Sequence, residues 1–235
     1  MKRCLKKING LLVRWSKKHS RKNLYEFLES QLLSLKSGMS VLNVGSGGEI
    51  ADKINTVLSQ NNISVKITSI DISEDRNPDI VADVCDMPFP DNNFDAVFLM
   101  EVLEHVHSPH KAISEIHRVL KPGGILVFSV PFIFPIHDRP CDYFRYTKYG
   151  IELLLRDYSQ VYIFERNSFS ETIAVLVSRL IIRESHRNRF FGALFMLTGG
   201  FALLPLLNML IKTDSITTGY AGNASKQIHT DAQNV

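Results

Sequence analysis

Cysteine is scarce in this chain of 235 residues, and Cys4, Cys85 and Cys141 lie far apart with no C-x-x-C pair. An odd count without such pairs disfavours a disulfide framework and a zinc site, so we expect no metal and a reducing compartment. The longest apolar run of the first 22 residues, Gly10–Val13, is too short for the core of a secretory signal. With 45% hydrophobic and 22% charged residues, the composition also excludes disordered and collagen-like chains.

Acidic residues are missing from residues 1–22, which carry nine Lys or Arg. The rest of the chain has 18 basic and 24 acidic residues, a net charge of −6, which disfavours an extensive nucleic-acid groove. The apolar residues of the basic segment recur at helical spacing: Leu5, Ile8, Leu11, Leu12 and Trp15. This pattern predicts a basic amphipathic helix. Such a helix either lies on an anionic membrane surface or is a solvated flank of the fold.

Strands and helices alternate in the middle of the chain. Apolar strands are predicted at Ser40–Val44, Val65–Ile70, Asp79–Ala82, Phe94–Met100 and Ile125–Val130, and helices at Asn23–Leu35, Gly47–Ser59 and Pro109–Leu120. We expect Lys121-Pro122-Gly123-Gly124 to stop the last of these helices. After a loop at Pro131–Tyr146, a helix is predicted at Thr147–Asp157 and a strand at Gln160–Arg166. Strands that are apolar on both faces and alternate with helices predict an α/β fold with a doubly wound, mostly parallel sheet.

A glycine-rich turn, Gly45–Gly48, joins the first strand to the next helix. This arrangement turns backbone N–H groups and a helix N-terminus toward a ligand at the carboxyl edge of the sheet. Ile50 stands where a dinucleotide fingerprint needs glycine, and the Gly-Lys-Ser/Thr ending of a P-loop is missing. Asp71 follows the second strand, where a carboxylate can accept hydrogen bonds from both hydroxyls of a ribose. In the plainer interpretation, the turn is only a connection and Asp71 only a cap.

Five motifs follow in order between Lys36 and Val130: Val41–Gly47, Asp71, Ala82–Asp95, Glu101–Val106 and Arg118–Gly124. Their order and spacing resemble the motif series of class I S-adenosylmethionine-dependent methyltransferases, of the type 11-like kind. The resemblance implies a Rossmann-like sheet of seven strands. It also implies S-adenosyl-L-methionine as the cofactor.

Carried over residue by residue, the resemblance implies a set of cofactor-binding residues: Asn43, Gly45, Ser46, Gly47, Asp71, Ile72, Asp83, Val84 and Glu101. The turn Gly45–Gly47 would wrap the methionine part. Asp71 would hold the ribose hydroxyls, with Ile72 against the adenine. Asp83 and Val84 would meet the adenine edge through a carboxylate and a backbone amide.

The fourth strand and the first turn complete this set. Glu101 would lie near the methionine amine and the reactive methyl group. Asn43 stands where the family usually has an acid, and we expect it to orient the loop by hydrogen bonds. Glu49 stands where a third glycine is common, and its carboxylate suits the helix N-terminus and also a cationic ligand.

The loop after the fifth strand is the expected place for groups that act on the methyl acceptor. We predict His137, beside Asp138, as general base or substrate orienter. Arg145 and Tyr146 are predicted to hold a phosphate or sugar, since a guanidinium offers a planar fork to anionic oxygens. Alternatively, the His-Asp pair caps the next helix and Arg145 pairs with Asp142. We expect His105 to be a packing or hydrogen-bonding residue.

The same loop, with its Tyr-Phe-Arg-Tyr-Thr-x-x-Gly run over Tyr143–Gly150, resembles a subgroup associated with bacterial surface polysaccharides and lipid-linked sugars. This second resemblance is less specific than the core motifs. It implies O-methylation of a glycan intermediate.

The segment between the strand Gln160–Arg166 and a last strand near Gly219–Lys226 is strongly apolar. A helix is predicted at Ser170–Ile182, and Phe190–Ile211 has 22 residues without a charge, whereas a membrane span needs about 17–25. A single crossing would separate the sixth and seventh strands, which pair in this family. We therefore expect a re-entrant or surface-lying helical hairpin docked on the membrane. The alternatives are a true span and a hairpin that is buried in protein or joins two copies of the chain.

These interpretations divide the chain into basic helices (1–35), a methyltransferase core (36–168), an apolar hairpin (169–213) and a last strand with a polar tail (214–235). We predict a methyltransferase that O-methylates a sugar or lipid-linked glycan. We expect it in the cytoplasm, peripheral to the inner membrane face, with an anionic membrane surface as its partner. A quinone or other lipid acceptor, and a catalytically silent cofactor-binding scaffold, are the alternatives.

Overall fold

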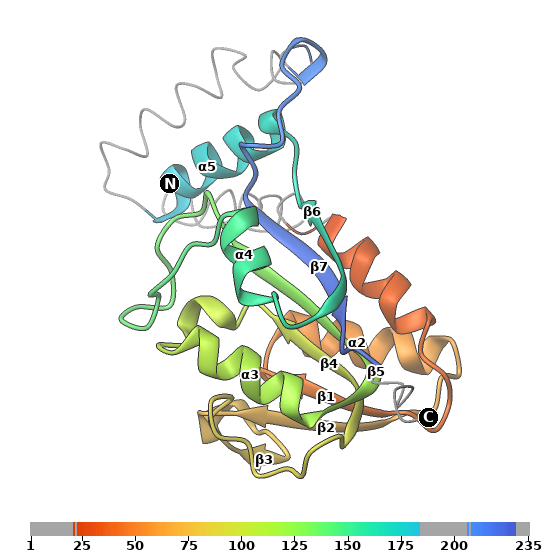
Figure 1. Cartoon of the computed structure of the whole chain (residues 1–235). Helices are drawn as coiled ribbons and strands as arrows, with labels where there is room; N and C mark the ends of the chain where they lie inside the picture. Colours follow the sequence, from red (N-terminus) through yellow and green to blue (C-terminus); the bar gives the residue numbers. More distant parts are fainter. Residues whose placement is uncertain (1–20, 22, 184–205, 207, 229–235) are drawn as a thin grey trace.

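The computed structural model of the chain describes residues 21, 23–183, 206 and 208–228, and its centre is a seven-stranded sheet (Figure 1). The strands lie in the order β3-β2-β1-β4-β5-β7-β6. Their bounds are β1 Ser40–Val44, β2 Lys66–Asp71, β3 Ile80–Val81, β4 Phe94–Met100, β5 Leu120–Pro131, β6 Ser159–Glu165 and β7 Gly219–Ser225. Only β7 is antiparallel to both of its neighbours. The predicted doubly wound, mostly parallel sheet is confirmed.

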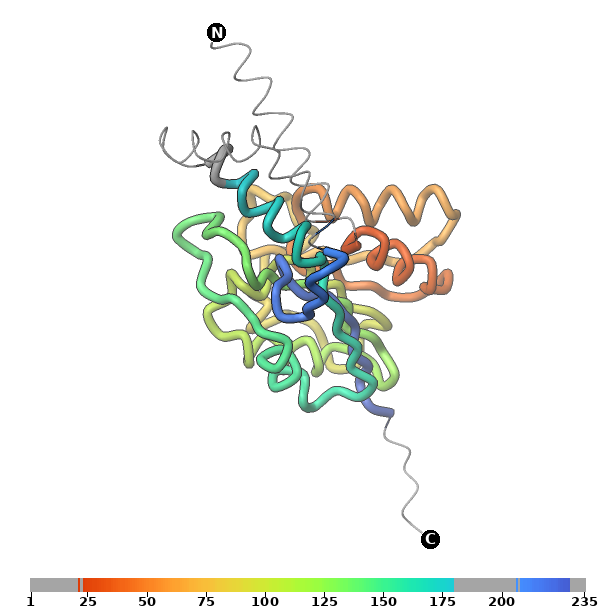
Figure 2. Tube along the Cα trace, turned by 90° about the horizontal axis from the view of Figure 1, so that it is seen from above, coloured from red at the N-terminus to blue at the C-terminus, as the bar shows by residue number. Residues whose placement is uncertain are grey.

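Helices cover both faces of this sheet. Their bounds are α2 Glu49–Gln60, α3 Pro109–Val119, α4 Lys148–Leu154 and α5 Phe169–Arg183, with short 3-10 turns η1 Glu74–Arg76 and η2 Leu103–His105. Leu24, Leu28 and Leu32 of the helical residues 23–33 share one core with Ile54 and Val57 of α2. The opposite core contains buried residues of α3 and α4, among them Ala112, Ile113, Ile116 and Ile151. Figure 2 shows these two helical layers on opposite sides of the sheet.

Strand β5 begins earlier than predicted. The helix α3 ends at Val119, but Lys121–Gly124 are part of the strand rather than a separate stop. Leu120 pairs with Phe94, and the register then shifts before Ala96 pairs with Ile125. Two glycines permit this irregularity: Gly123 has φ +77°, and a Cβ on Gly124 would lie 2.8 Å from the Lys121 carbonyl oxygen.

The seventh strand depends on small residues where it passes between β5 and β6. A Cβ on Gly222 would meet the Tyr162 carbonyl oxygen, and a Cβ on Gly219 would meet the Val130 carbonyl oxygen and the Arg166 guanidinium. Antiparallel pairing with β5 runs from Ile125–Ser225 to Pro131–Gly219. The backbone of β7 thus approaches its neighbours closely, and it leaves room at Gly219 for an arginine side chain.

Two segments singled out by the sequence analysis fall outside the described residues. The basic helix of residues 1–22 does so except for Arg21, and the apolar stretch Phe190–Ile211 does so except at residues 206 and 208–211. Helix α5 and strand β7 are described, but most of the chain between them is not. The hairpin and the division of the chain into four parts therefore stay predictions. Of the helices in the described ranges, none combines the length and apolarity that crossing a membrane requires.

Candidate cofactor and acceptor site

The glycine turn lies where β1 ends, and its conformation requires glycine at its first position. Gly45 has φ +88°, and a Cβ there would lie only 2.6 Å from Val102 Cγ2. The Gly45 N–H donates to the Ile70 carbonyl oxygen at 2.8 Å, and the Ser46 N–H donates to Asp71 Oδ2 at 3.2 Å. The end of β2 therefore holds the turn after β1 in place.

Asp71 occupies the position expected of a ribose-binding carboxylate. Its Oδ1 accepts the Ser73 N–H at 3.0 Å, so each oxygen has one backbone donor and keeps capacity for another hydrogen bond. Ile72 beside it is 74% exposed, although it is a large apolar residue. An exposed apolar side chain next to a carboxylate at the carboxyl edge fits an adenosine.

Asn43 is buried at the end of β1, and only one side of its amide is bonded. The Asn43 Nδ2 lies 3.5 Å from the Gly45 carbonyl oxygen, which agrees with the predicted role in orienting the loop. Its Oδ1 has no hydrogen-bond partner among the described residues. A buried acceptor of this kind calls for a donor, and the ammonium group of S-adenosylmethionine is one. Along the same edge, Asp83 Oδ1 accepts the Cys85 N–H at 2.8 Å, and Val84 is buried.

Glu101 follows β4 in a left-handed backbone conformation, with φ 58°. Its Oε1 accepts Ser129 Oγ at 2.9 Å and Arg166 Nη1 at 2.6 Å. Burial alone would raise the pKa of the Glu101 carboxyl, but the charge and hydrogen bond of Arg166 outweigh burial and hold this pKa below its usual value. Glu101 therefore stays ionised, beside the turn that is expected to hold a cationic cofactor.

No local pattern indicates Arg166 as a partner of Glu101, since the two residues are 65 positions apart. Arg166 follows β6, and its guanidinium crosses the ends of β7 and β5 to reach β4. A second cation lies nearby: Arg21 Nη1 is 2.7 Å from Glu49 Oε2. The sequence indicated that the Glu49 carboxylate suits a cationic ligand. In the structure, this carboxylate forms an ion pair with Arg21 instead.

On the acceptor side, Arg145 pairs with Asp142 rather than standing free. Its Nη1 is 2.5 Å from Asp142 Oδ1, and its Nη2 is 2.6 Å from Oδ2, a bidentate pair. Burial would raise the pKa of Asp142, but Arg145 and the His137 backbone N–H lower it to about 2. The sequence analysis left open that Arg145 pairs with Asp142, and the structure has this pair. The guanidinium therefore stabilises the loop.

The other residues predicted to act on the methyl acceptor differ in burial and in their contacts. Tyr146 is buried, and its hydroxyl donates to the Leu103 carbonyl oxygen at 2.9 Å, so it anchors the loop to η2. Asp138 is exposed. The acid nearest His137 is instead Asp142, whose Oδ2 lies 3.3 Å from His137 Nδ1. His105 is a hydrogen-bonding residue as predicted, with its Nδ1 at 2.7 Å from the Cys141 carbonyl oxygen.

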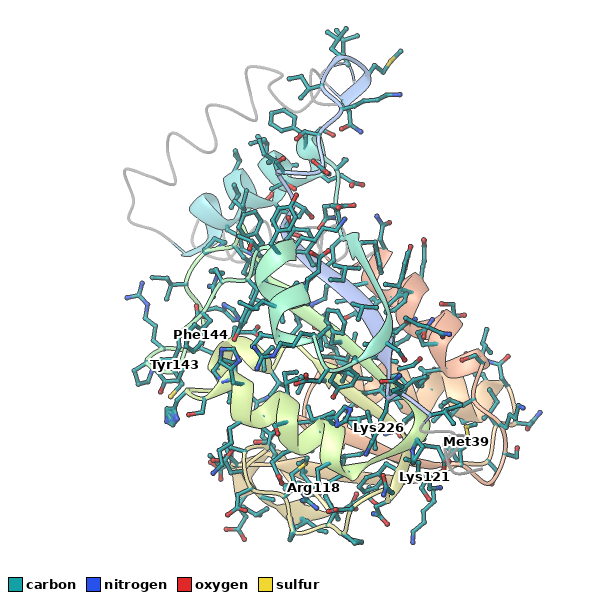
Figure 3. All side chains as sticks on the ribbon, viewed as in Figure 1. Met39, Arg118, Lys121, Tyr143, Phe144 and Lys226 are labelled. Atoms are coloured by element: carbon teal, nitrogen blue, oxygen red, sulfur yellow. The ribbon has the colours of Figure 1, made fainter. Side chains whose placement is uncertain are left out.

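Glu104 is a second site residue that sequence reasoning missed. It is fully buried, and His137 Nε2 lies 3.6 Å from its Oε1. Burial raises the pKa of the Glu104 carboxyl. Its backbone carbonyl accepts the N–H groups of Tyr143 (2.9 Å) and Phe144 (3.2 Å), which ties the loop to η2. In Figure 3, Tyr143 and Phe144 lie on the opposite side of the molecule from Met39, Lys121 and Lys226, which mark the amino edge of the parallel strands.

Comparison with known proteins identifies this arrangement. Residues 42–128, which run from β1 to β5, match the family described as a methyltransferase domain. This central part of the chain thus has the sequence of a methyltransferase domain and the fold of solved S-adenosylmethionine-dependent methyltransferases. A solved S-adenosylmethionine-dependent methyltransferase of Archaeoglobus fulgidus has the same fold, with a TM-score of 0.58 at 16% identity over 88% of this chain and 95% of that one.

Curated relatives that match this part of the chain are named as methyltransferases of sterols and of quinone biosynthesis. A sterol 24-C-methyltransferase of Gibberella zeae is 36% identical over 133 residues, which are 52% of this chain and 35% of that protein. A ubiquinone/menaquinone biosynthesis C-methyltransferase of Psychromonas ingrahamii is 28% identical over 72% of this chain and 74% of that protein. The chain thus spans only about a third of the sterol methyltransferase that it matches.

The residues predicted for the cofactor lie along one edge of the methyltransferase sheet. Gly45 and Glu101 follow β1 and β4, Asp71 is the last residue of β2, and these strands are neighbours. Their chemistry fits S-adenosylmethionine: acceptors for its hydroxyls and ammonium, and an apolar residue for its adenine. The individual binding and catalytic roles remain predictions.

Proposed function

We propose that the chain transfers the methyl group of S-adenosylmethionine to a hydroxyl of a sugar or lipid-linked glycan at a membrane surface. One observation carries this proposal. The buried Glu104, three residues after Glu101 in sequence, has its Oε1 3.6 Å from His137 Nε2 of the acceptor loop. Polar, ionisable groups suit an oxygen nucleophile, whose proton must leave as the methyl group is transferred.

The bound cofactor supplies an activated methyl group, so the protein's main task is alignment. Asp71 and the turn Gly45–Gly47 fix the cofactor, while Glu101 attracts its cationic end. The loop braced by Arg145 and Asp142 orients the acceptor and keeps water away. Alignment of this kind is worth about 7–11 kcal/mol of barrier lowering, and a base at the hydroxyl adds about 10²–10⁴-fold.

A quinone or other lipid acceptor is the second candidate, and the names of the curated relatives favour it. Its acceptor atom would be carbon, which also loses a proton. The ionisable loop serves either acceptor, but a sterol-like or quinone-like molecule needs a mainly apolar pocket.

Methyl transfer itself tests the function. Purified protein with S-adenosylmethionine carrying a labelled methyl group should label the lipid-linked glycan fraction of a bacterial extract, with a mass increase of one CH₂. The quinone fraction serves as the competing acceptor. Label in quinones alone would favour the second candidate. Cofactor binding without labelling of any fraction would contradict an enzyme and favour the scaffold.

A membrane location is part of this proposal and has two supports. The nine Lys or Arg of residues 1–22 would lie among anionic headgroups. Met209 and Leu210, at the end of the apolar stretch, are 75% and 74% exposed, which suits contact with lipid.

Deleting residues 1–22 is expected to weaken sedimentation with anionic liposomes, because about 1 kcal/mol of attraction is lost for each basic residue near the surface. The loss should shrink at high salt. Since Arg21 also pairs with Glu49, a deletion of residues 1–20 is the better control for folding. Equal binding of the full and shortened chains would remove this segment from the membrane contact.

A further inference from the structure

Three potential ligand atoms converge beside the acceptor loop. The Glu104 carboxylate, the His105 imidazole and the His137 imidazole each offer one atom, and all three atoms lie within 4.8 Å of one another. Glu104 Oε1 is 3.7 Å from His105 Nε2 and 3.6 Å from His137 Nε2. Tetrahedral ligands at about 2.1 Å from a zinc ion stand about 3.4 Å apart, so both distances are close to those of a formed site.

Glu104 is an independent sign of a missing partner. Its side chain is fully buried, and neither carboxylate oxygen has a hydrogen-bond partner among the described residues. A buried carboxylate left in this state is costly unless it is paired or binds a metal ion. The carboxylate therefore calls for a cation on the side where the two imidazole rings face its Oε1.

Contacts at the Nδ1 atoms of the two histidines orient their Nε2 atoms toward Glu104. The Nδ1 of His105 lies 2.7 Å from the Cys141 carbonyl oxygen, which can only accept, so Nδ1 carries the proton and Nε2 presents a lone pair to Glu104. The Nδ1 of His137 faces Asp142 Oδ2 at 3.3 Å. A carbonyl or carboxylate on the far nitrogen is the usual support of a metal-binding histidine.

We propose that Glu104, His105 and His137 bind one divalent cation of the zinc type, with a coordination position left open for the acceptor. Two imidazoles and one carboxylate suit zinc or a similar transition metal rather than magnesium or calcium, which prefer oxygen ligands. Three protein ligands and an open fourth position are typical of catalytic zinc. This assignment departs from the sequence-based expectation of no metal.

The assignment deepens the proposed function, on which its catalytic meaning rests. His137 was predicted as general base or substrate orienter, and as a ligand it would orient the acceptor through the cation. The cation would hold the hydroxyl oxygen of the acceptor and polarise its O–H bond.

Cobalt binding to the full, untagged chain tests the site without reference to activity. After removal of metals by a chelator, the wild type is expected to bind one Co²⁺ and to show the visible absorption of a four-coordinate site. Glu104→Gln and His137→Gln should bind Co²⁺ more than about 100-fold more weakly. Their matched controls, Glu152→Gln and His110→Gln at exposed positions, should bind like the wild type.

Glu104→Gln keeps the shape of the side chain and removes only its charge, and circular dichroism checks that both ligand variants fold. Failure of the wild type to bind Co²⁺, or equal binding by Glu104→Gln, would overturn the site. If metal-free protein transfers methyl groups at the full rate, the cation has no role and the proposed function stands. If Co²⁺ binds as expected but no acceptor is methylated, the proposed function fails and the site remains.

Discussion

Replacing Arg166 by methionine is expected to lower the free energy of unfolding by about 3 kcal/mol at pH 7. The buried Arg166 guanidinium is the nearest cation to Glu101, with Nη1 at 2.6 Å from Oε1. Methionine fills part of the volume but leaves the carboxylate without its countercharge. This loss of stability is at the low end of the range for a broken buried ion pair, because the Glu101 side chain is still 18% exposed. Chemical denaturation at pH 7 measures the effect.

The pH dependence separates this charge effect from a packing defect. The pKa of Glu101 is lowered in the folded wild type, so the pair stabilises the fold above the ordinary carboxyl pKa, and this stability is lost as pH falls through the lowered pKa. The stability gap between Arg166→Met and wild type should therefore narrow as the pH falls from the ordinary carboxyl pKa toward the lowered pKa of Glu101. Arg166→Lys should recover part of the stability. An unchanged gap across this range would contradict the ion-pair explanation.

Replacing Asp71 by asparagine is expected to weaken S-adenosylmethionine binding by about 10–100-fold. The variant loses the charge that strengthens hydrogen bonds to the ribose. Its amide N–H₂ would also face one of the backbone N–H groups of Ser46 and Ser73, which disturbs the glycine turn. Isothermal titration calorimetry with the cofactor measures the affinity.

Asp75→Asn is the matched control for this variant, since Asp75 is an exposed acid four residues away. It should bind the cofactor like the wild type, and both variants should unfold at similar denaturant concentrations. Equal cofactor affinity of Asp71→Asn and Asp75→Asn would show that the carboxylate of Asp71 does not hold the cofactor.

Local patterns predicted most of the secondary structure. The strands Ser40–Val44 and Phe94–Met100 have the predicted bounds, because a short apolar run with turn residues at both ends has few other solutions. Strand β5 was misjudged at its start, since Lys121-Pro122-Gly123-Gly124 is typical of a helix stop and its bulged pairing depends on Phe94 and Asp95 of a neighbouring strand.

Some site residues could likewise be predicted from the sequence, and others could not. The glycine turn and Asp71 could be placed from the sequence because each lies at the carboxyl end of a strand, and parallel strands bring these ends to one edge. The contacts of the acceptor loop could not. Asp142 rather than Asp138 lies near His137, and Arg145 is used within the loop, because the path of a loop depends on the surface beneath it.

The sequence by itself determined the sheet, its cofactor edge and the excess of positive charge near the start of the chain, since these follow from periodicity, strand order and composition. Only the tertiary structure decided that Arg166 reaches Glu101 and that His105 and His137 meet at Glu104. Arg166 and His137 are both distant in sequence from the carboxylates that they reach. The burial and charge partners of an ionisable side chain depend on packing that no local pattern records.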